Sequence, residues 1–387
     1  ASVSCLRNAT SSACGLAAGT NDNAILSQVT SFADLPTALE SLLDPTKPSI
    51  VNIQRSAGAN GIDPSFEPVQ TWKSSLTFSG DLNLGWLGDN YEFSVDYLRG
   101  DVRKGILWKD YRGGLSPIAY APDGRPIYRR NAERGLFVTG VASSDSGSDL
   151  ILTNTDQGFQ QAWAFSLSKS WDSGFDGSFS YTLTDAKDVN PGTSSVAFSN
   201  WGGVATADVN NPGLATSNYE IKHSYKLRLS WTKELSDDNK TNVSLFMEHR
   251  SGLPYSFVYN MSGSASMSTF GDGASNRQLF YVPQVDSSGN VTLTSDPIVT
   301  YAAGFNMAAF NEYLKGVGLT DHAGKISPRN GFRSDDVTRF DLRLSQELPA
   351  FVPNGAKLKL FADFINIGNM LNDEWGVLEQ VDFPYVA

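Results

Sequence analysis

The chain has 387 residues, a formal net charge of -11 and only 18% charged residues, with 35 glycines and 11% aromatic residues. The acidic charge argues against nucleic acid as a partner, because neutralising a phosphate backbone requires a basic surface. The sequence has no run of about 18 apolar residues, so it offers no candidate transmembrane helix. A chain of this composition could enter a membrane only with β-strands that form a barrel.

The first segment, residues 1–67, is expected to be a loop region that leads into the first strand. It contains the two cysteines of the chain, Cys5 and Cys14. Their spacing is typical of a small loop closed by a disulfide, which implies an oxidising compartment. Two free thiols or half of a metal site are the alternatives, but a four-ligand zinc site needs further Cys or His nearby.

Beyond the first segment, apolar and polar residues alternate with a period of two, which predicts β-strands. In 219–235, for example, Leu227 and Leu229 alternate with Lys226 and Arg228. The predicted strands are 71–79, 91–98, 163–168, 178–184, 219–235, 243–248, 339–345 and 357–364. The fold class is therefore all-β, with each strand apolar on one face and polar on the other.

The alternation alone fits two architectures. In a soluble sandwich the apolar face is the core, whereas in an outer-membrane barrel it meets lipid and the polar face lines a wet lumen. The connections separate the two, because short turns alternate strictly with long loops, which cover about 109–150, 188–217 and 260–335. This layout is typical of outer-membrane barrels, and long loops are uncommon in compact soluble domains. We therefore expect an antiparallel transmembrane β-barrel.

Tryptophans near the predicted strand ends agree with a barrel. They are Trp86, Trp108, Trp171, Trp231 and Trp375. Two aromatic belts at the headgroup levels would place them there, although large aromatics also fill strand ends in other β proteins. In the last long loop, residues 307–316 have an apolar stripe and predict a helix that packs over the barrel mouth or onto neighbouring loops.

The charged residues of the polar faces are candidates to line the lumen. They are Glu220, Lys222, Lys226, Arg228, Glu248, Arg250, Arg339, Asp341, Arg343, Glu347, Lys357, Lys359 and Asp363. Arg343 and Asp363 are expected on neighbouring strands, where ladders of ion pairs can form. Such residues can set the selectivity of a pore or contact a plug. Alternatively, they only solvate the wall and pair across strands.

No catalytic set is recognisable in the sequence. His223 and His249 are explained by amphipathic positions near strand ends, and neither a GxSxG nor an HExxH motif occurs. We therefore expect no enzyme, no metal site and no cofactor.

The order of turns places both chain ends on the side of the long loops, which would be extracellular. An open sheet cannot leave its edge amides unpaired in lipid. We therefore expect residues 68–387 to be the C-terminal part of a larger barrel, of which about eight strands are present. A complete eight-stranded barrel is the alternative, but its packed lumen would have to hold many charged groups.

Five segments carry a resemblance to a known family. They are LTNTDQGF (152–159), AKDVNPGTSSVAFSNW (186–201), HRSGLPYSFVYN (249–260), ISPRNGFRSDDVTRFDLRLSQELP (326–349) and FADFINIGNMLNDEWG (361–376). Together with the strand spacing, they resemble the C-terminal half of TonB-dependent outer-membrane receptors of the Oar-like group.

The resemblance implies a barrel of about 22 strands in a Gram-negative outer membrane, plugged by an N-terminal domain and energised by TonB. It implies uptake of a large, scarce solute. The implied partners are outer-membrane lipid and lipopolysaccharide, the plug and remaining strands of the receptor, TonB, and an unknown ligand or surface protein. The sequence has no counterpart of the plug, the TonB-contacting segment or the last strand. The alternative function is a structural or adhesion protein for surface assembly, whose loops bind a protein partner.

Overall fold

The computed structural model describes residues 59–111, 114–117, 119–128, 148–236, 238–259, 277–349, 356–382 and 386–387. The predicted disulfide between Cys5 and Cys14 lies outside these residues, as does most of the predicted loop region 1–67. Among the helices that are described, none has the length and apolar character needed to span a membrane.

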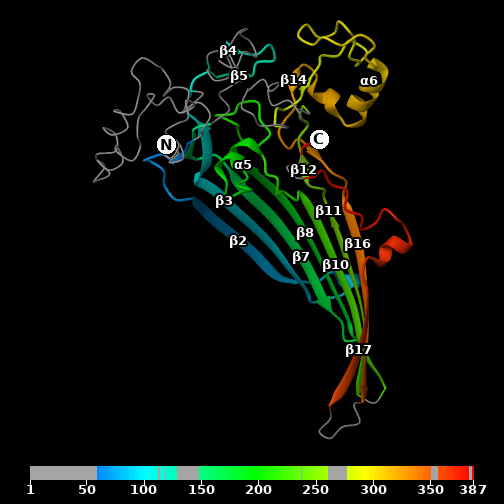
Figure 1. Ribbon diagram of the computed structural model, residues 1–387. Coiled ribbons are helices and arrows are strands. Elements are labelled where there is room, and N and C mark those ends of the chain that lie inside the picture. Colours follow the sequence, from blue (N-terminus) through cyan, green and yellow to red (C-terminus); the bar gives the residue numbers. More distant parts are fainter. Residues whose placement is uncertain are drawn as a thin grey trace, which may run out of the picture.

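Eight long strands form the body of an all-β fold (Figure 1). They are β2 (Gln70–Leu82), β3 (Tyr91–Asp110), β7 (Phe159–Ser170), β8 (Phe175–Asp188), β10 (His223–Ser236), β11 (Asn239–Arg250), β16 (Val337–Pro349) and β17 (Lys357–Phe364). Each is hydrogen-bonded to the next in chain order, and every one of these pairs is antiparallel. All eight predicted strands are thus confirmed, most of them longer than predicted.

Shorter elements complete the fold. The short strands of the main sheet are β1 (Asn60–Ile62), β6 (Leu150–Thr155) and β9 (Ala215–Thr216). The separate two-stranded pairs are β4 (Ala119–Tyr120) with β5 (Pro126–Ile127), β12 (Pro254–Tyr255) with β15 (Phe332–Arg333), and β13 (Tyr281–Val282) with β14 (Lys325–Ile326). The helices are α5 (Ala197–Gly202) and α6 (Met307–Gly316), with 3-10 turns η4 (Gly85–Leu87), η6 (Leu319–His322) and η7 (Ile367–Met370).

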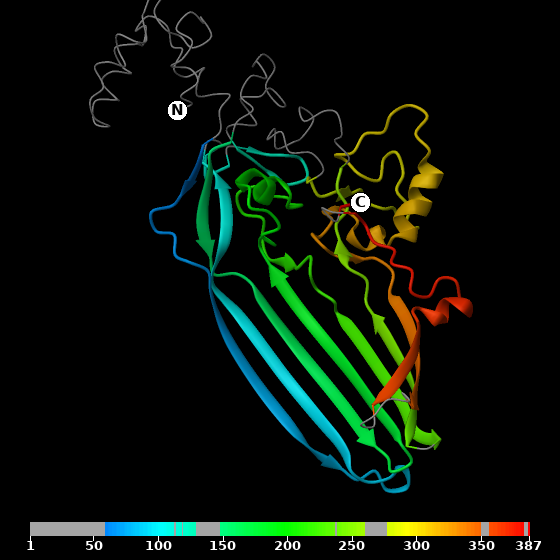
Figure 2. The same ribbon diagram turned by 60° about the horizontal axis from the view of Figure 1, so that its bottom comes forward.

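Short and long connections alternate around the sheet, as predicted. At one end of the strands, which we call the short-turn end, tight hairpins join β7 to β8 and β10 to β11. In the first of these, Gly174 has a positive φ of 87°, and a Cβ there would lie 2.1 Å from the carbonyl oxygen of Thr232. At the other, the long-loop end, the connections carry the helices and short strands (Figure 2).

One strand begins later than predicted. The prediction places a strand over 219–235, but β10 begins at His223. The preceding residues turn, because the Glu220 N–H donates to the carbonyl oxygen of Ser217 at 3.1 Å. The side chain of Glu220 is buried, and its carboxylate accepts from the Ala186 N–H at 2.6 Å. The alternation of apolar and polar residues therefore begins before the first residue of the strand, over residues that lie outside the sheet.

The register brings like residues onto the same face of the sheet, because directly paired residues on adjacent strands point the same way. One continuous row is Phe78, Val95, Phe165, Tyr181, Tyr225 and His249. The adjacent row on the opposite side is Ser79, Ser94, Ser166, Ser180, Lys226, Glu248 and Arg339. We call these two sides the apolar face and the polar face.

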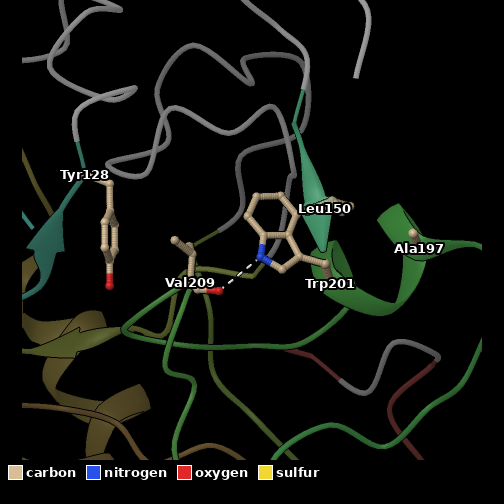
Figure 3. Close-up of a cluster of buried hydrophobic side chains, with 5 residues drawn as sticks. All are labelled: Tyr128, Leu150, Ala197, Trp201 and Val209. Atoms are coloured by element: carbon tan, nitrogen blue, oxygen red, sulfur yellow. Dashed lines mark hydrogen bonds between the residues drawn. The ribbon is translucent and has the colours of Figure 1, made fainter. Parts of the chain in front are cut away.

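The buried hydrophobic cores lie in the long connections rather than beneath the strands. The Trp201 cluster consists of Tyr128, Leu150, Ala197, Trp201 and Val209 (Figure 3). The Trp201 indole Nε1–H donates to the Val209 carbonyl oxygen at 3.0 Å.

The second core lies in the connection between β11 and β16. The Leu314 cluster consists of Phe257, Val282, Val291, Leu314 and Leu319. Leu314 belongs to α6, whose predicted bounds of 307–316 are confirmed. The Asn306 side chain caps this helix by accepting from the Ala309 N–H at 3.1 Å. As predicted, α6 packs onto neighbouring loop segments.

The long sheet has two free edges within the described residues, because β2 pairs only with β3, and β17 only with β16. Near the long-loop end, β1 pairs in parallel with β6. The backbone of Ala387 also lies at this end, where its N–H donates to the Ser256 carbonyl oxygen at 2.8 Å.

Candidate functional site

The apolar face is a broad hydrophobic surface that no described residue covers. Its large side chains are well exposed, for example Leu76 at 70%, Phe78 at 67% and Leu360 at 54%. The residues that are buried in these strands are instead polar. They are Ser230, Asn239 and Ser345, in a set of strands that comprises β7, β8, β10, β11, β16 and β17. A soluble sheet would bury its apolar side, so this surface is the first candidate functional feature.

Aromatic side chains run across the apolar face near the long-loop end. The rings of Tyr97 and Trp163 are 4.6 Å apart, and those of Tyr181 and Tyr225 are also 4.6 Å apart. The Tyr181 hydroxyl lies 2.9 Å from Nδ1 of His223. Each side chain combines an apolar ring with a polar atom, a combination that suits the boundary between an apolar and a wet environment.

A second group of aromatic side chains lies at the short-turn end of the same face. The rings of Tyr91 and Trp171 meet edge to face with their centres 6.2 Å apart, and the ring centres of Phe175 and Trp231 are 6.1 Å apart. The Lys169 ammonium is 4.5 Å from the ring centre of Tyr91, within cation–π range. The apolar face is therefore bounded by aromatic side chains at both ends.

The predicted tryptophan belts correspond only partly to these two rows. Trp86, Trp171 and Trp231 lie at the short-turn end, and Trp86 is 92% exposed. Trp108 instead packs against the Trp201 cluster. The ring centres of Trp375 and Phe340 are 5.2 Å apart. The aromatic residues at the long-loop end occupy two adjacent rows, Tyr97 with Trp163 and Tyr181 with Tyr225, and this belt was not identified from the sequence. Aligning the strands by their hairpins would have revealed it.

Just beyond the aromatic row at the long-loop end, the apolar face becomes polar. Arg99 donates to the side-chain Oε1 of Gln161 at 2.9 Å, and the Gln161 Nε2 donates to the Asp185 carboxylate at 3.4 Å. In the next row, Asp101, Phe159 and Lys187 are paired across β3, β7 and β8.

The polar face carries the charged residues that were predicted to line a lumen. Residues on its paired strands are Lys226, Arg228, Glu248, Arg250, Arg339, Asp341, Arg343, Glu347, Lys357, Lys359 and Asp363. Several form ion pairs, among them Arg339 with Asp341 at 3.2 Å and Lys357 with Glu347 at 3.3 Å. Most of these side chains are accessible, so they present both charge signs to whatever lies over this face.

Two predicted lumen-facing residues lie outside this set, because they precede β10. Glu220 is buried and forms an ion pair with Arg333 of β15, so its charge is committed within the protein. Lys222 is exposed, and its carbonyl oxygen accepts from the Thr184 N–H at 2.9 Å.

Two central strands carry only short side chains on most of the polar face. These residues are Ala162, Ala164, Ser166, Ser168, Ser170, Ser178, Ser180, Thr182, Thr184 and Ala186. Long charged side chains flank them on β10, β11 and β16. The strip therefore leaves more free space above β7 and β8 than its neighbours do.

A hollow of about 480 Å³ opens on this strip near the short-turn end, lined by residues that include Glu92, Asp176 and Arg228. The Ser170 hydroxyl donates to Asp176 at 2.6 Å, which orients the carboxylate. Both charge signs at the rim of the hollow suit a polar solute or a polar protein surface.

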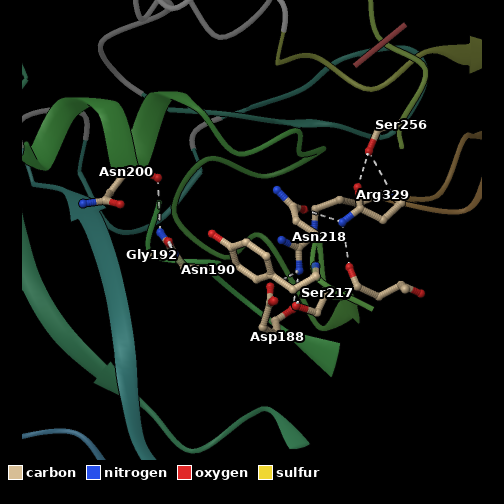
Figure 4. A network of polar contacts seen from close by, with 11 residues as sticks. Asp188, Asn190, Gly192, Asn200, Ser217, Asn218, Ser256 and Arg329 are labelled. Atoms are coloured by element: carbon tan, nitrogen blue, oxygen red, sulfur yellow. Dashed lines mark hydrogen bonds and ion pairs between the residues drawn. The ribbon is translucent and has the colours of Figure 1, made fainter. Parts of the chain in front are cut away.

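A buried polar network ties the long connections together above β8 (Figure 4). Arg329 donates from Nη2 to the backbone oxygen of Asp188 and, at 3.2 Å, to its carboxylate. Burial lowers the pKa of Arg329, although the Asp188 carboxylate partly compensates. The adjacent Asn330 donates to the Thr216 carbonyl oxygen at 2.7 Å, and its N–H donates to the Ser256 hydroxyl at 2.8 Å.

A second polar pair supports the Leu314 cluster. The Tyr281 hydroxyl donates to Asp296 at 3.0 Å, and burial together with this bond raises the pKa of Tyr281 to about 12. Burial alone would raise the pKa of Asp296, but hydrogen bonds from the Gln284 and Ile298 N–H groups and from Tyr281 outweigh it and lower that pKa.

Within the part of the chain that the structure describes, no three His, Cys, Asp or Glu side chains are grouped to hold a metal ion. The described residues offer two surfaces, one apolar and one polar, and the loops at one end of them. A scan against protein-family models, a search of curated proteins and a search of solved structures each found no match.

Proposed function

We propose that the eight long strands are part of the wall of an outer-membrane β-barrel, with the apolar face in contact with lipid. The observation that carries this proposal is the uncovered apolar face between two aromatic rows. Trp163 lies on β7 and Trp171 follows directly after its last residue, Ser170, so the two are eight residues or about 26 Å apart along the strand direction. At a strand tilt of about 40° this spans about 20 Å, comparable with the roughly 25 Å apolar band of outer-membrane barrels.

The two free edges support a wall that continues beyond the described strands. In lipid, the unpaired amides of β2 and β17 would each cost several kcal/mol. We therefore infer that further strands of a larger barrel pair with these edges. The long-loop end would then face the cell exterior, and the short-turn end the periplasm.

We further propose that the barrel is a receptor of the TonB-dependent class that takes up a large, scarce solute. The polar face supports this role, because it combines both charge signs with a strip of small side chains over β7 and β8. A plug domain or a moving solute could occupy that space. The five segments that resemble the Oar-like group support the same assignment.

A surface-assembly protein, whose loops bind a protein partner, is the second candidate. It is favoured by exposed apolar side chains in the connection between β11 and β16, including Leu293 at 67%, Phe305 at 42% and Tyr313 at 52%. A protein partner would bury such side chains on binding.

Thiol labelling in intact outer membranes tests the lipid-facing assignment. In a background where Cys5 and Cys14 are replaced by serine, Phe179→Cys and Leu227→Cys probe the apolar face. The matched variants Ser180→Cys and Lys226→Cys probe the polar face one residue away. We expect a water-soluble maleimide to label only the polar-face pair, and a lipid-soluble one to label the apolar-face pair. Labelling of all four sites by the water-soluble reagent would overturn the membrane assignment.

The two functions are separated by two variants, one single and one double. Ser180→Trp narrows the strip on the polar face, so a transport role predicts slower solute uptake with unchanged surface binding. Replacing both Phe305 and Tyr313 by serine removes exposed loop aromatics, so an assembly role predicts loss of the surface partner with unchanged uptake.

A further inference from the structure

At the long-loop end, the apolar face carries basic side chains held against aromatic rings. The Arg99 guanidinium lies 4.4 Å from the ring centre of Phe159, and the Lys187 ammonium lies 6.0 Å from the same ring. The Arg103 guanidinium lies 5.7 Å from the ring centre of Trp72. All of them are just beyond the aromatic row that contains Trp163, where the face changes from apolar to polar.

The nearby carboxylates neutralise only part of this charge. Asp101 accepts from Nε and Nη2 of Arg99 at 2.9 and 2.6 Å, and Asp185 accepts from Gln161. Among the described residues, no carboxylate lies within ion-pair distance of Lys187 or Arg103, because Asp101 pairs with Arg99 and Glu67 with Lys104. The patch therefore has a net positive charge in a chain whose overall charge is -11.

The two remaining cations are well separated across the sheet. Trp72, Asp101, Phe159 and Lys187 are successive partners on β2, β3, β7 and β8. Neighbouring strands lie about 4.8 Å apart, so Arg103 over Trp72 and Lys187 beside Phe159 are separated by on the order of 10–15 Å. One phosphate group cannot contact both side chains, whereas a headgroup with two phosphates can.

We propose that this patch, composed of Arg99, Arg103, Lys187, Phe159 and Trp72, binds the headgroup of a diphosphorylated glycolipid in the outer leaflet. The inference rests on the proposed membrane function, which places the patch at headgroup level. Arg103 holds one phosphate and Lys187 the other. Phe159 and Trp72 hold the two cations against the sheet and contact the upper part of the acyl chains, as aromatic side chains do at membrane interfaces.

A lipid titration tests this proposal. The purified full chain in a neutral detergent is titrated with diphosphoryl lipid A, and its thermal midpoint and the bound lipid in native mass spectra are recorded. An interfacial Lys or Arg contributes about fivefold in affinity for an anionic surface, so Arg103→Gln and Lys187→Gln should each weaken binding about fivefold. The double variant should weaken it by about 25-fold. The control Arg228→Gln loses the same charge from the polar face and should bind as the unsubstituted chain does.

Three results would overturn the proposal. The first is unchanged lipid binding by the double variant. The second is a loss of binding in Arg228→Gln as large as in the patch variants, and the third is stabilisation by inorganic phosphate as large as by diphosphoryl lipid A. Equal binding of monophosphoryl lipid A would overturn the two-phosphate assignment. Failure of the membrane function itself is recognised separately, because the apolar-face cysteines would then react with the water-soluble maleimide.

Discussion

Arg343 and Asp363 lie directly opposite each other on β16 and β17, and the guanidinium donates from Nε and Nη2 to the two carboxylate oxygens at 2.5 and 2.7 Å. The sequence predicted them as neighbours on one face. Both side chains remain accessible, at 58% and 36%. Exposed pairs contribute little to stability because water screens them. Their main effect is therefore on the charge that the polar face presents.

This gives a first prediction. Arg343→Gln, Asp363→Asn and the double variant should each leave the midpoint of thermal unfolding in detergent almost unchanged. A double-mutant cycle should give a small coupling between the two residues, because the pair is solvated. A large loss of stability in either single variant would mean that the pair is shielded from water, against its accessibility here.

The apolar face gives a second prediction. Phe179 lies in the same row as Leu167 and Leu227, well within the apolar face. Phe179→Arg should reduce the free energy of folding into lipid vesicles by about 2–4 kcal/mol, because it places a charge against hydrocarbon. Heat-dependent mobility of the folded protein on gels measures the folded fraction.

The adjacent Ser180 supplies the control for that experiment, because Ser180→Arg adds the same side chain to the polar face. It should fold into vesicles almost as well as the unsubstituted chain. Equal loss in both variants would contradict the assignment of the two faces.

The Leu314 cluster gives a third prediction. Leu314 is fully buried at 0% exposure, whereas its neighbour Tyr313 is 52% exposed. Leu314→Ala should destabilise the loop region by about 2–5 kcal/mol, because it removes buried methyl groups and leaves a cavity. Tyr313→Ala should have a much smaller effect. Protease resistance of the connection between β11 and β16 is the appropriate measurement, and equal sensitivity in both variants would contradict the packing described here.

The Tyr281–Asp296 hydrogen bond gives a pH-dependent prediction. Because the pKa of Asp296 is lowered in the folded protein, its ionised form stabilises the fold above the ordinary aspartate pKa of 3.8. Asp296→Asn should therefore destabilise the loop region by about 1–3 kcal/mol at neutral pH. The difference from the unsubstituted chain should shrink as the pH falls below about 4.

Tyr281 sets the opposite limit. Its pKa is raised from 10.0 to about 12, so its hydrogen bond contributes fully below pH 10 and is lost as the pH rises through 12. Unfolding of the loop region by denaturant, measured against pH in the unsubstituted chain and in Asp296→Asn, tests the two limits together. A difference between Asp296→Asn and the unsubstituted chain that stays constant from pH 2 to pH 7 would exclude the ionised carboxylate as its source.

The sequence predicted the strands well because their alternation is strong and local. Leu227 and Leu229 alternate with Lys226 and Arg228 wherever β10 is placed, and the stripe of α6 from Met307 to Leu314 is equally local. The loop features depend on contacts between distant residues. Trp108 joins the Trp201 cluster because β6 pairs with the end of β3, and alternation contains no information about that pairing.

The polar face was predicted residue by residue but not as a surface. Its charged residues were identified from their parity, that is, from whether they occupy odd or even positions along a strand. The strip of small residues on β7 and β8 appears only when the two strands are set in register. The same limit explains Glu220, which has the correct parity but turns into a buried ion pair with Arg333. Parity gives the face of a residue only where the chain remains in the sheet.

The separation of the buried cores from the strands has a consequence for how the molecule responds to denaturants. The Trp201 and Leu314 clusters bury apolar side chains against each other, so urea and heat act on them as on an ordinary water-soluble core. The long strands bury almost no apolar side chains against protein. Exposure of apolar surface to water dominates the heat-capacity change of unfolding, so the loops supply most of that change in a detergent-solubilised sample. Calorimetry would then report the melting of the loops, while the hydrogen-bonded strands remain paired beneath them.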